Sequence, residues 1–293
     1  MKLNISDLSK TYKNGVKALN NINLEIGEGM FGLLGPNGAG KSSLMRTIST
    51  LQQADSGTIR FNDIDVFADP ISLRKVLGYL PQEFGVYPNV QAHKLLDYFA
   101  GLKGITSKAD RKKIVEYVLE VTNLTDAKRR AVSSFSGGMK QRFGIAQMLL
   151  NDPQLIIVDE PTAGLDPAER KRFLNILRQI SKGHIVIFST HIVEDVKELC
   201  LDMAIMNQGA ILLRESPTDA SSRLSSKVWT KRLDGDIAAA QSMYNVLSTS
   251  YNPDHSVNIR VYSDGLPGEE FKSSEASLED VYFYHLNQES VPA

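Results

Sequence analysis

The sequence lacks the features that mark several common classes of protein. It has a single cysteine, Cys200, so it can form neither a disulfide within the chain nor a thiolate metal cluster. That scarcity favours a reducing compartment such as the cytosol. Because Cys200 stands between Leu199 and Leu201, we expect a small buried apolar side chain at this position rather than a reactive thiol.

Long apolar runs and an excess of charge are absent as well. No run of about eighteen apolar residues occurs, and the N-terminal MKLNISDLSK has no signal-peptide core, so we expect neither a membrane span nor a leader. With 33 basic and 34 acidic residues, the net charge of -1 gives no sign of a partner such as nucleic acid or an anionic membrane. The 293 residues suffice for one large domain with an appendage, or for two modest domains.

A glycine-rich segment, MFGLLGPNGAGKSSLMRTI at 30–48, joins an apolar run to a helical pattern. Its spacing is typical of a phosphate-binding loop, whose glycines let backbone N–H groups converge on one anion at a helix N-terminus. We expect Lys41 to reach the β- and γ-phosphates and the Ser42 hydroxyl to bind Mg²⁺. A plain glycine turn with an exposed lysine is the alternative. The residues predicted to hold the nucleotide here are Gly35, Pro36, Asn37, Gly38, Ala39, Gly40, Lys41, Ser42 and Ser43.

The segments on either side of a short turn predict a small antiparallel sheet before this loop. They run from Leu3 to Leu8 and from Ala18 to Ile26, with Lys13-Asn14-Gly15 between them. Tyr12 precedes the turn, where its ring could stack on an adenine or pack at the strand end. The position alone leaves both interpretations open.

The pattern after the loop helix is first strand-like and then helical. Ser56 to Phe61 and Val76 to Leu80 predict strands, and Gln82 follows the second one closely. From Pro88 to Thr125 the apolar residues recur at helical spacing, which predicts a helical insert at about 86–150. We therefore expect an α/β chain interrupted by helices.

A Ser-Gly-Gly sequence, Ser136, Gly137 and Gly138, stands at a helix start, before a segment from Phe143 to Leu150 that predicts a helix. Free N–H groups at such a start could form a second anion site. A plain serine N-cap followed by flexible glycines is the alternative.

Two adjacent carboxylates follow a continuous apolar run. Leu155 to Val158 is typical of a central parallel strand, and Asp159 and Glu160 come directly after it. Ligands bind at the carboxyl ends of strands in α/β sheets, so Asp159 could face a metal and Glu160 a water molecule. A solvated acidic loop is the alternative. His191 stands just after another predicted strand, Ile185 to Phe188.

The composition changes from about Ser216 onward. Short strand-like segments, Val228 to Leu233 and Val257 to Tyr262, alternate with polar residues, and an amphipathic helix is predicted from Ser277 to Leu286. We therefore place a domain boundary there, with an ATP-binding region at 1–215 and an accessory region at 216–293.

In order and spacing, the loop, Gln82, Ser-Gly-Gly, the Asp-Glu strand end, Gly164-Leu165-Asp166 and His191 resemble the nucleotide-binding subunit of an ATP-binding cassette (ABC) transporter. The resemblance covers roughly 2–215. It implies an α/β fold: a P-loop NTPase core with an N-terminal antiparallel β subdomain and a helical insert, here followed by a small C-terminal α+β appendage. That appendage would serve dimerisation or regulation.

The resemblance also assigns chemistry within one subunit. Lys41 and Gln82 would act at the triphosphate, with Gln82 touching Mg²⁺, the attacking water and the path to the membrane subunit. Asp159 would hold Mg²⁺ through water, Glu160 would be the general base, and His191 would hold the γ-phosphate and the water.

Other implied roles concern the adenine and a second subunit. Tyr12 would stack on the adenine. Ser136, Gly137 and Gly138 would contact the γ-phosphate of an ATP held by the opposing subunit, and Asp166 would cross to that subunit's phosphate loop.

The chain departs from the family pattern at four positions near these motifs. Phe135 and Met139 replace a common leucine and glutamine beside Ser-Gly-Gly, Ser43 replaces a frequent threonine, and Ala163 replaces a frequent serine. The residues assigned to chemistry are all present.

The resemblance therefore implies a peripheral ATPase, with ATP and Mg²⁺ as cofactors, that powers a separate integral membrane permease from the cytoplasmic face. Its partners would be that permease and a second copy of itself or a homologous ATPase subunit, with no nucleic acid. The tail sequence Leu278 to Tyr282 resembles the end of export ATPases. The alternatives are a soluble ATPase acting on nucleic acid or ribosomes, and a nucleotide-binding module without turnover.

Overall fold

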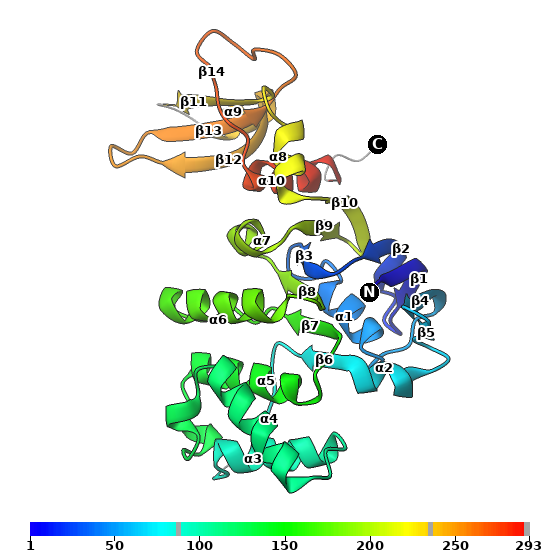
Figure 1. Ribbon diagram of the computed structural model, residues 1–293. Coiled ribbons are helices and arrows are strands. Elements are labelled where there is room, and N and C mark those ends of the chain that lie inside the picture. The colour runs from blue at the N-terminus through cyan, green and yellow to red at the C-terminus, as the bar shows by residue number, and fades with distance from the viewer. Residues whose placement is uncertain (86–88, 234–236, 290–293) are drawn as a thin grey trace.

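The computed structural model describes residues 1–85, 89–233 and 237–289, which form three sheets and several helical layers (Figure 1). The strands are β1 Leu3–Thr11, β2 Lys17–Ile26, β3 Gly29–Leu34, β4 Ser56–Phe61, β5 Ile64–Asp65, β6 Leu77–Leu80, β7 Leu155–Asp159, β8 Ile185–Thr190, β9 Asp202–Asn207, β10 Ala210–Glu215, β11 Val228–Leu233, β12 Asn245–Tyr251, β13 Val257–Tyr262 and β14 Lys272–Ser273. The α-helices are α1 Lys41–Ile48, α2 Pro70–Val76, α3 Ala92–Leu102, α4 Lys108–Val121, α5 Gly137–Met148, α6 Pro167–Ile180, α7 Val193–Leu199, α8 Pro217–Arg223, α9 Ile237–Met243 and α10 Leu278–Glu289. None of these described helices has both the length and the apolar character needed to cross a membrane.

The central sheet runs in the order β10-β9-β3-β8-β7-β6, and only β10 pairs antiparallel. Successive residues of β7 point to opposite faces, as strand geometry requires. Ile156 and Val158 pack with α5, α6 and α7 on one face, while Leu155 and Ile157 pack with α1 and the antiparallel sheet on the other. Burial on both faces explains why β7 reads as a continuous apolar run.

The register of this sheet aligns the ends of three strands. Leu34 of β3 lies opposite Thr190 of β8, and Asp159 of β7 lies opposite Ser189 of β8. The segments that follow β3, β7 and β8 therefore leave the sheet at one edge, which is the usual ligand-binding edge of a parallel sheet.

The antiparallel sheet has the order β2-β1-β4-β5, which confirms the predicted N-terminal β subdomain. At the opposite end from the tail, α3, α4 and α5 enclose an apolar cluster of their own (Figure 1). The expected helix over Phe143 to Leu150 is longer at its start, since α5 begins at Gly137 and gives way to a 3₁₀ turn after Met148. Residues 86–88, at the start of the predicted insert, lie outside the described residues.

The tail forms a four-stranded antiparallel sheet, β12-β13-β11-β14, with α8, α9 and α10 against it. Both predicted strands are present, and the hydroxyl of Ser277 accepts the N–H of Asp280, 3.2 Å away, where α10 begins. Leu278 and Val281 of α10 share one apolar cluster with Val196 and Leu199 of α7. The apolar core therefore continues across the boundary proposed at 215/216, which stays a prediction.

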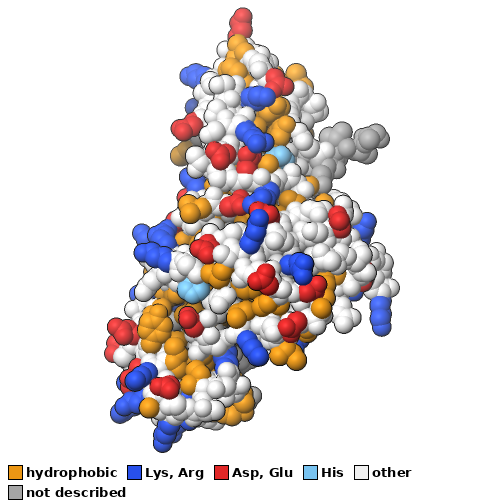
Figure 2. Space-filling model, turned by 45° about the vertical axis from the view of Figure 1, so that its right-hand side comes forward, with side chains coloured by type: hydrophobic (Ala, Val, Ile, Leu, Met, Phe, Trp, Pro, Cys, Tyr) orange, Lys and Arg blue, Asp and Glu red, His pale blue; other side chains and the backbone are white. Residues whose placement is uncertain are grey.

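Acidic and basic side chains are interspersed over the face shown in Figure 2. This distribution agrees with the balanced composition of the chain. On this face neither sign of charge dominates.

Candidate functional site

A cleft of about 920 Å³ opens at the carboxyl ends of the central strands. Its size suits a small-molecule ligand such as a nucleotide. It is lined by residues from the antiparallel sheet, the glycine-rich loop and the ends of β6, β7 and β8. The predicted site residues among them are Tyr12, Asn37, Gly38, Gly40, Lys41, Ser42, Ser43, Gln82, Glu160 and His191.

The glycine-rich loop packs closely against the rest of the chain. A Cβ atom at Gly35 would lie 2.3 Å from the carbonyl oxygen of Met206, and one at Gly40 would lie 2.3 Å from that of Ala18. Gly40 also has a φ of 105°, a conformation that favours glycine. The loop can therefore wrap tightly before α1 begins at Lys41.

Lys41 lies over the loop and is only 4% exposed. Its Nζ donates hydrogen bonds to the carbonyl oxygens of Gly35 and Pro36, at 2.8 and 3.0 Å. The same Nζ is 3.0 Å from Oε1 of Glu160. This arrangement excludes the alternative of an exposed lysine on a glycine turn.

Glu160 bridges two of the predicted catalytic side chains. Its Oε1 pairs with Lys41, and its Oε2 is 3.2 Å from Nδ1 of His191. Its backbone has a φ of 44°, which costs a non-glycine residue of the order of 1 kcal/mol and is held here by surrounding contacts. The N–H of Glu160 donates to Oγ of Ser189 at 3.0 Å.

Asp159 ends β7 with its side chain almost fully buried, at 3% exposure. The hydroxyl of Ser189 donates to its Oδ1 at 2.6 Å. Ser189 thus orients both Asp159 and the backbone of Glu160, and no local pattern in the sequence indicates this role. The burial of both carboxylates, with Glu160 8% exposed, excludes a solvated acidic loop.

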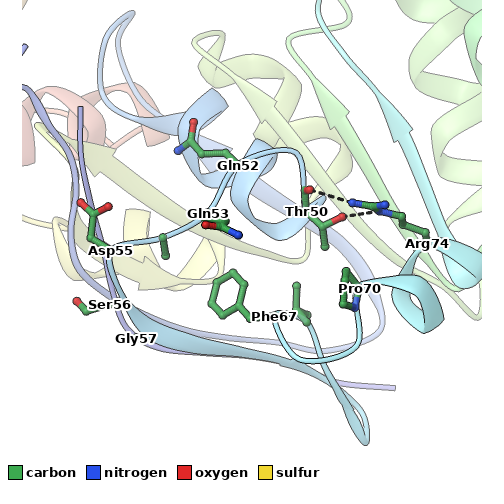
Figure 3. Close-up of a pocket in the computed structure, with 11 residues that line it drawn as sticks. Thr50, Gln52, Gln53, Asp55, Ser56, Gly57, Phe67, Pro70 and Arg74 are labelled. Carbon is green, nitrogen blue, oxygen red and sulfur yellow. Dashed lines mark hydrogen bonds between the residues drawn. The ribbon is translucent and has the colours of Figure 1, made fainter. Parts of the chain in front are cut away.

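Tyr12 lies on the rim of the cleft with its hydroxyl fixed by two partners. The hydroxyl is 3.0 Å from Oγ of Ser43 and donates to Oε1 of Gln52 at 2.8 Å. A separate hollow of about 360 Å³ is lined by Gln52 as well as by Thr50 and Arg74, and in it Arg74 donates hydrogen bonds to Thr50 (Figure 3). That hollow contains no predicted site residue, so we assign no role to it.

The Ser-Gly-Gly segment and Asp166 do not line the cleft. Ser136 caps α5 by accepting the N–H of Met139 at 3.3 Å, and Asp166 caps α6 by accepting the N–H of Glu169 at 2.9 Å. A Cβ at Gly138 would lie 2.4 Å from Oε2 of Glu169, so the starts of the two helices touch. Ser136 is thus the N-cap of α5, and the second anion site at this helix start stays a prediction.

Comparison with known proteins decides the family. The sequence profile of the ABC transporter family matches residues 19–163. The linearmycin resistance ATP-binding protein LnrL of Bacillus subtilis is 37% identical over 225 residues, which cover 76% of this chain and 71% of that protein. The chain belongs to the ABC transporter family. It is therefore an ATP-binding and ATP-hydrolysing subunit, and the predicted resemblance is confirmed.

Two further similarities extend this assignment. The Nod factor export ATP-binding protein I of Rhizobium etli is 36% identical over 220 residues, which cover 74% of this ABC ATPase and 69% of that protein. A dimeric ATP-binding cassette, solved in a post-hydrolysis state with ADP and Pi, has a TM-score of 0.66 at 25% identity, over 73% of this chain and 98% of that one. The predicted fold class is thereby confirmed.

Proposed function

We propose that this ABC ATPase powers export through a separate membrane permease, with ATP held between two head-to-tail subunits. One observation carries the proposal. The Glu160 carboxylate lies between Lys41 and His191 in the cleft, whereas Ser136 and Asp166 lie outside it. One copy therefore supplies the phosphate loop and the proposed base. The starts of α5 and α6 that would complete its ATP site would come from a second copy.

The proposed roles follow from the contacts around Glu160. A γ-phosphate offers Lys41 a more highly charged partner than the carboxylate does, so ATP would draw Nζ away from Oε1. Glu160 could then accept a proton from the attacking water, while His191 holds the other carboxylate oxygen. Hydrolysis of this kind depends mainly on positioning and charge neutralisation.

The donor set fits Mg²⁺, which prefers oxygen ligands and usually keeps several waters. Ser42 and Gln82 line the cleft, and Asp159 ends the neighbouring strand with one carboxylate oxygen held by Ser189. When bound, the ion would neutralise charge on the transferring phosphoryl group. Among the residues proposed to hold the nucleotide, we assign Tyr12 to stacking on the adenine, because its hydroxyl contacts Ser43 beside the phosphate loop.

The partners are proposed from the exposed helix starts and from the relatives. Ser136, Gly137 and Gly138 would meet the γ-phosphate bound by the opposing subunit, and the N-terminal ends of helices favour such anions. Asp166 would cross to the opposing phosphate loop. The relatives that serve linearmycin resistance and Nod factor export support export, and a permease would hold the chain at the cytoplasmic face of the membrane.

The test is Glu160→Gln, with Glu194→Gln as the matched control. Glu194 lies near His191 but is exposed, and it pairs only loosely with Lys197 at 3.8 Å. Glu160→Gln should bind ATP, form an ATP-dependent dimer in size-exclusion chromatography, and lose about 10²-fold or more in turnover. Turnover of the Glu160→Gln variant at the parental rate would refute the assignment of the base. ATPase stimulation by nucleic acid without membrane association would instead favour the soluble alternative.

A further inference from the structure

One buried carboxylate outside the cleft joins the segments that carry Glu160, Asp166 and His191. Asp195 of α7 is 0% exposed. Its Oδ2 accepts a hydrogen bond from Oγ1 of Thr162 at 2.9 Å, and its Oδ1 accepts one from Nε of Arg170 at 2.7 Å.

Each partner of Asp195 belongs to a different functional segment. Thr162 is two residues beyond Glu160, and it is itself buried at 3% exposure. The N–H of Arg170 donates to the carbonyl of Asp166 at 2.9 Å, which places Arg170 in the first turn of α6. Asp195 stands on the helix that follows His191, and its own N–H donates to Ile192. Three segments therefore meet at one side chain.

The loop that begins at Glu160 needs such an anchor. Glu160 and Gly164 both have positive φ angles, 44° and 74°, so its path is one that most residues avoid. Its internal backbone hydrogen bonds are long: the N–H of Leu165 donates to the carbonyl of Thr162 at 3.2 Å, and that of Ala163 donates to the carbonyl of Glu160 at 3.4 Å. The hydrogen bond to Asp195 fixes the middle of this loop, because a fully buried side chain cannot exchange its partners for water.

We propose that Asp195 is a positioning residue for ATP hydrolysis: through Thr162 it holds the Glu160 loop, and through Arg170 it holds the start of α6. The inference rests on the proposed role of Glu160 as the base. The phosphate loop lies between β3 and α1. The two hydrogen bonds described for Asp195 go to Thr162 and Arg170, and neither reaches that loop. Loss of the carboxylate's charge should therefore slow the chemical step and leave ATP affinity in place.

The chain contains a matched buried pair that lacks the proposed role. Asp280 pairs with Arg260 at 2.7 Å in the tail, where the two side chains are 1% and 29% exposed. The corresponding values for Asp195 and Arg170 are 0% and 29%. A merely structural ion pair at Asp195 would behave as the tail pair does.

The experiment compares Asp195→Asn, Thr162→Val, Thr162→Ser and the control Asp280→Asn in the full chain. Asp195→Asn and Thr162→Val should lower kcat at least ten-fold, with the Kd for ATP within two-fold of the parent. Thr162→Ser restores the hydroxyl and should recover the rate to within two-fold of the parent. Asp280→Asn should lower the midpoint of thermal unfolding without lowering kcat.

The double variant Asp195→Asn with Thr162→Val should be no slower than the slower single variant, since Thr162→Val removes a contact that Asp195→Asn already weakens. Additive losses would overturn the proposal, as would a parental kcat in either folded single variant. An equal loss of kcat in Asp280→Asn would also overturn it. Glu160→Gln is assayed in parallel. If Glu160 is not the base, this variant hydrolyses ATP at the parental rate regardless of the result for Asp195→Asn, so the two errors can be told apart.

Discussion

Gly138→Ala tests whether the second residue of α5 must be glycine because of packing. An added Cβ would lie 2.4 Å from Oε2 and 2.7 Å from Cγ of Glu169, distances that require something to shift. Glu169 is restrained, since it pairs with Arg172 and lies 3.3 Å from Nε of the buried Arg142. Overpacking of this kind typically costs about 1–3 kcal/mol, and we expect the free energy of unfolding to fall by that amount.

Gly137→Ala is the matched control, because no atom lies within 4 Å of a Cβ built at Gly137. Alanine is the better helix former by up to about 1 kcal/mol, so this variant should be unchanged or more stable. The assay is urea unfolding of both variants, alone and with Glu169→Ala. In that background the gap between them should close, since the obstructing side chain is gone. Equal destabilisation by both substitutions, or a gap that persists without Glu169, would refute the reasoning.

Two further predictions concern the buried hydroxyl and the buried thiol. Ser189→Ala removes the hydroxyl that donates to Asp159. A hydrogen bond to a charged group is worth about 1.5–3 kcal/mol, so we expect kcat to fall about ten-fold or more. A Mg²⁺ titration of ATPase activity measures this loss. Burial, with Asp195 and Asp202 nearby, raises the pKa of Cys200 from 9.0 to about 12. Its contribution to stability is therefore complete below pH 9 and is lost as pH rises toward 12. Between pH 8 and pH 10 the free energy of unfolding of the parent should fall by about 1.4 kcal/mol relative to that of Cys200→Ala, as measured by denaturant unfolding. If the two proteins change alike over this range, the assigned burial of the thiol is wrong.

The features that could be predicted from the sequence depend on neighbours along the chain. The phosphate loop and the end of β7 are local patterns, in which residue type and spacing already express the geometry. The Tyr12 hydroxyl contacts, by contrast, depend on Gln52, forty residues away, which no periodicity connects to it.

The missed residues all act across the fold. Ser189 reaches Asp159 because the parallel register of β7 and β8 sets them opposite, thirty residues apart. Thr162 and Asp195 meet across thirty-three residues. A lone serine or aspartate on a strand or short helix carries no local sign of such a partner, since tertiary packing decides it.

The tail was harder to predict because its elements are short and weakly patterned. β12, with the sequence NVLSTSY, has no clean alternation of apolar and polar residues, so the sequence predicts only β11 and β13 of this sheet. The predicted helix near the end of the chain, α10, was found because its apolar stripe and Ser277 cap are strong local signals.

One consequence follows from the helix that comes directly after His191. On one side α7 is tied by Asp195 to the loops around the nucleotide cleft, and on the other Val196 and Leu199 are embedded with Leu278 and Val281 of the tail. The tail therefore covers apolar side chains of the ATP-binding region, and a chain that stopped near residue 215 would leave part of that surface open to water.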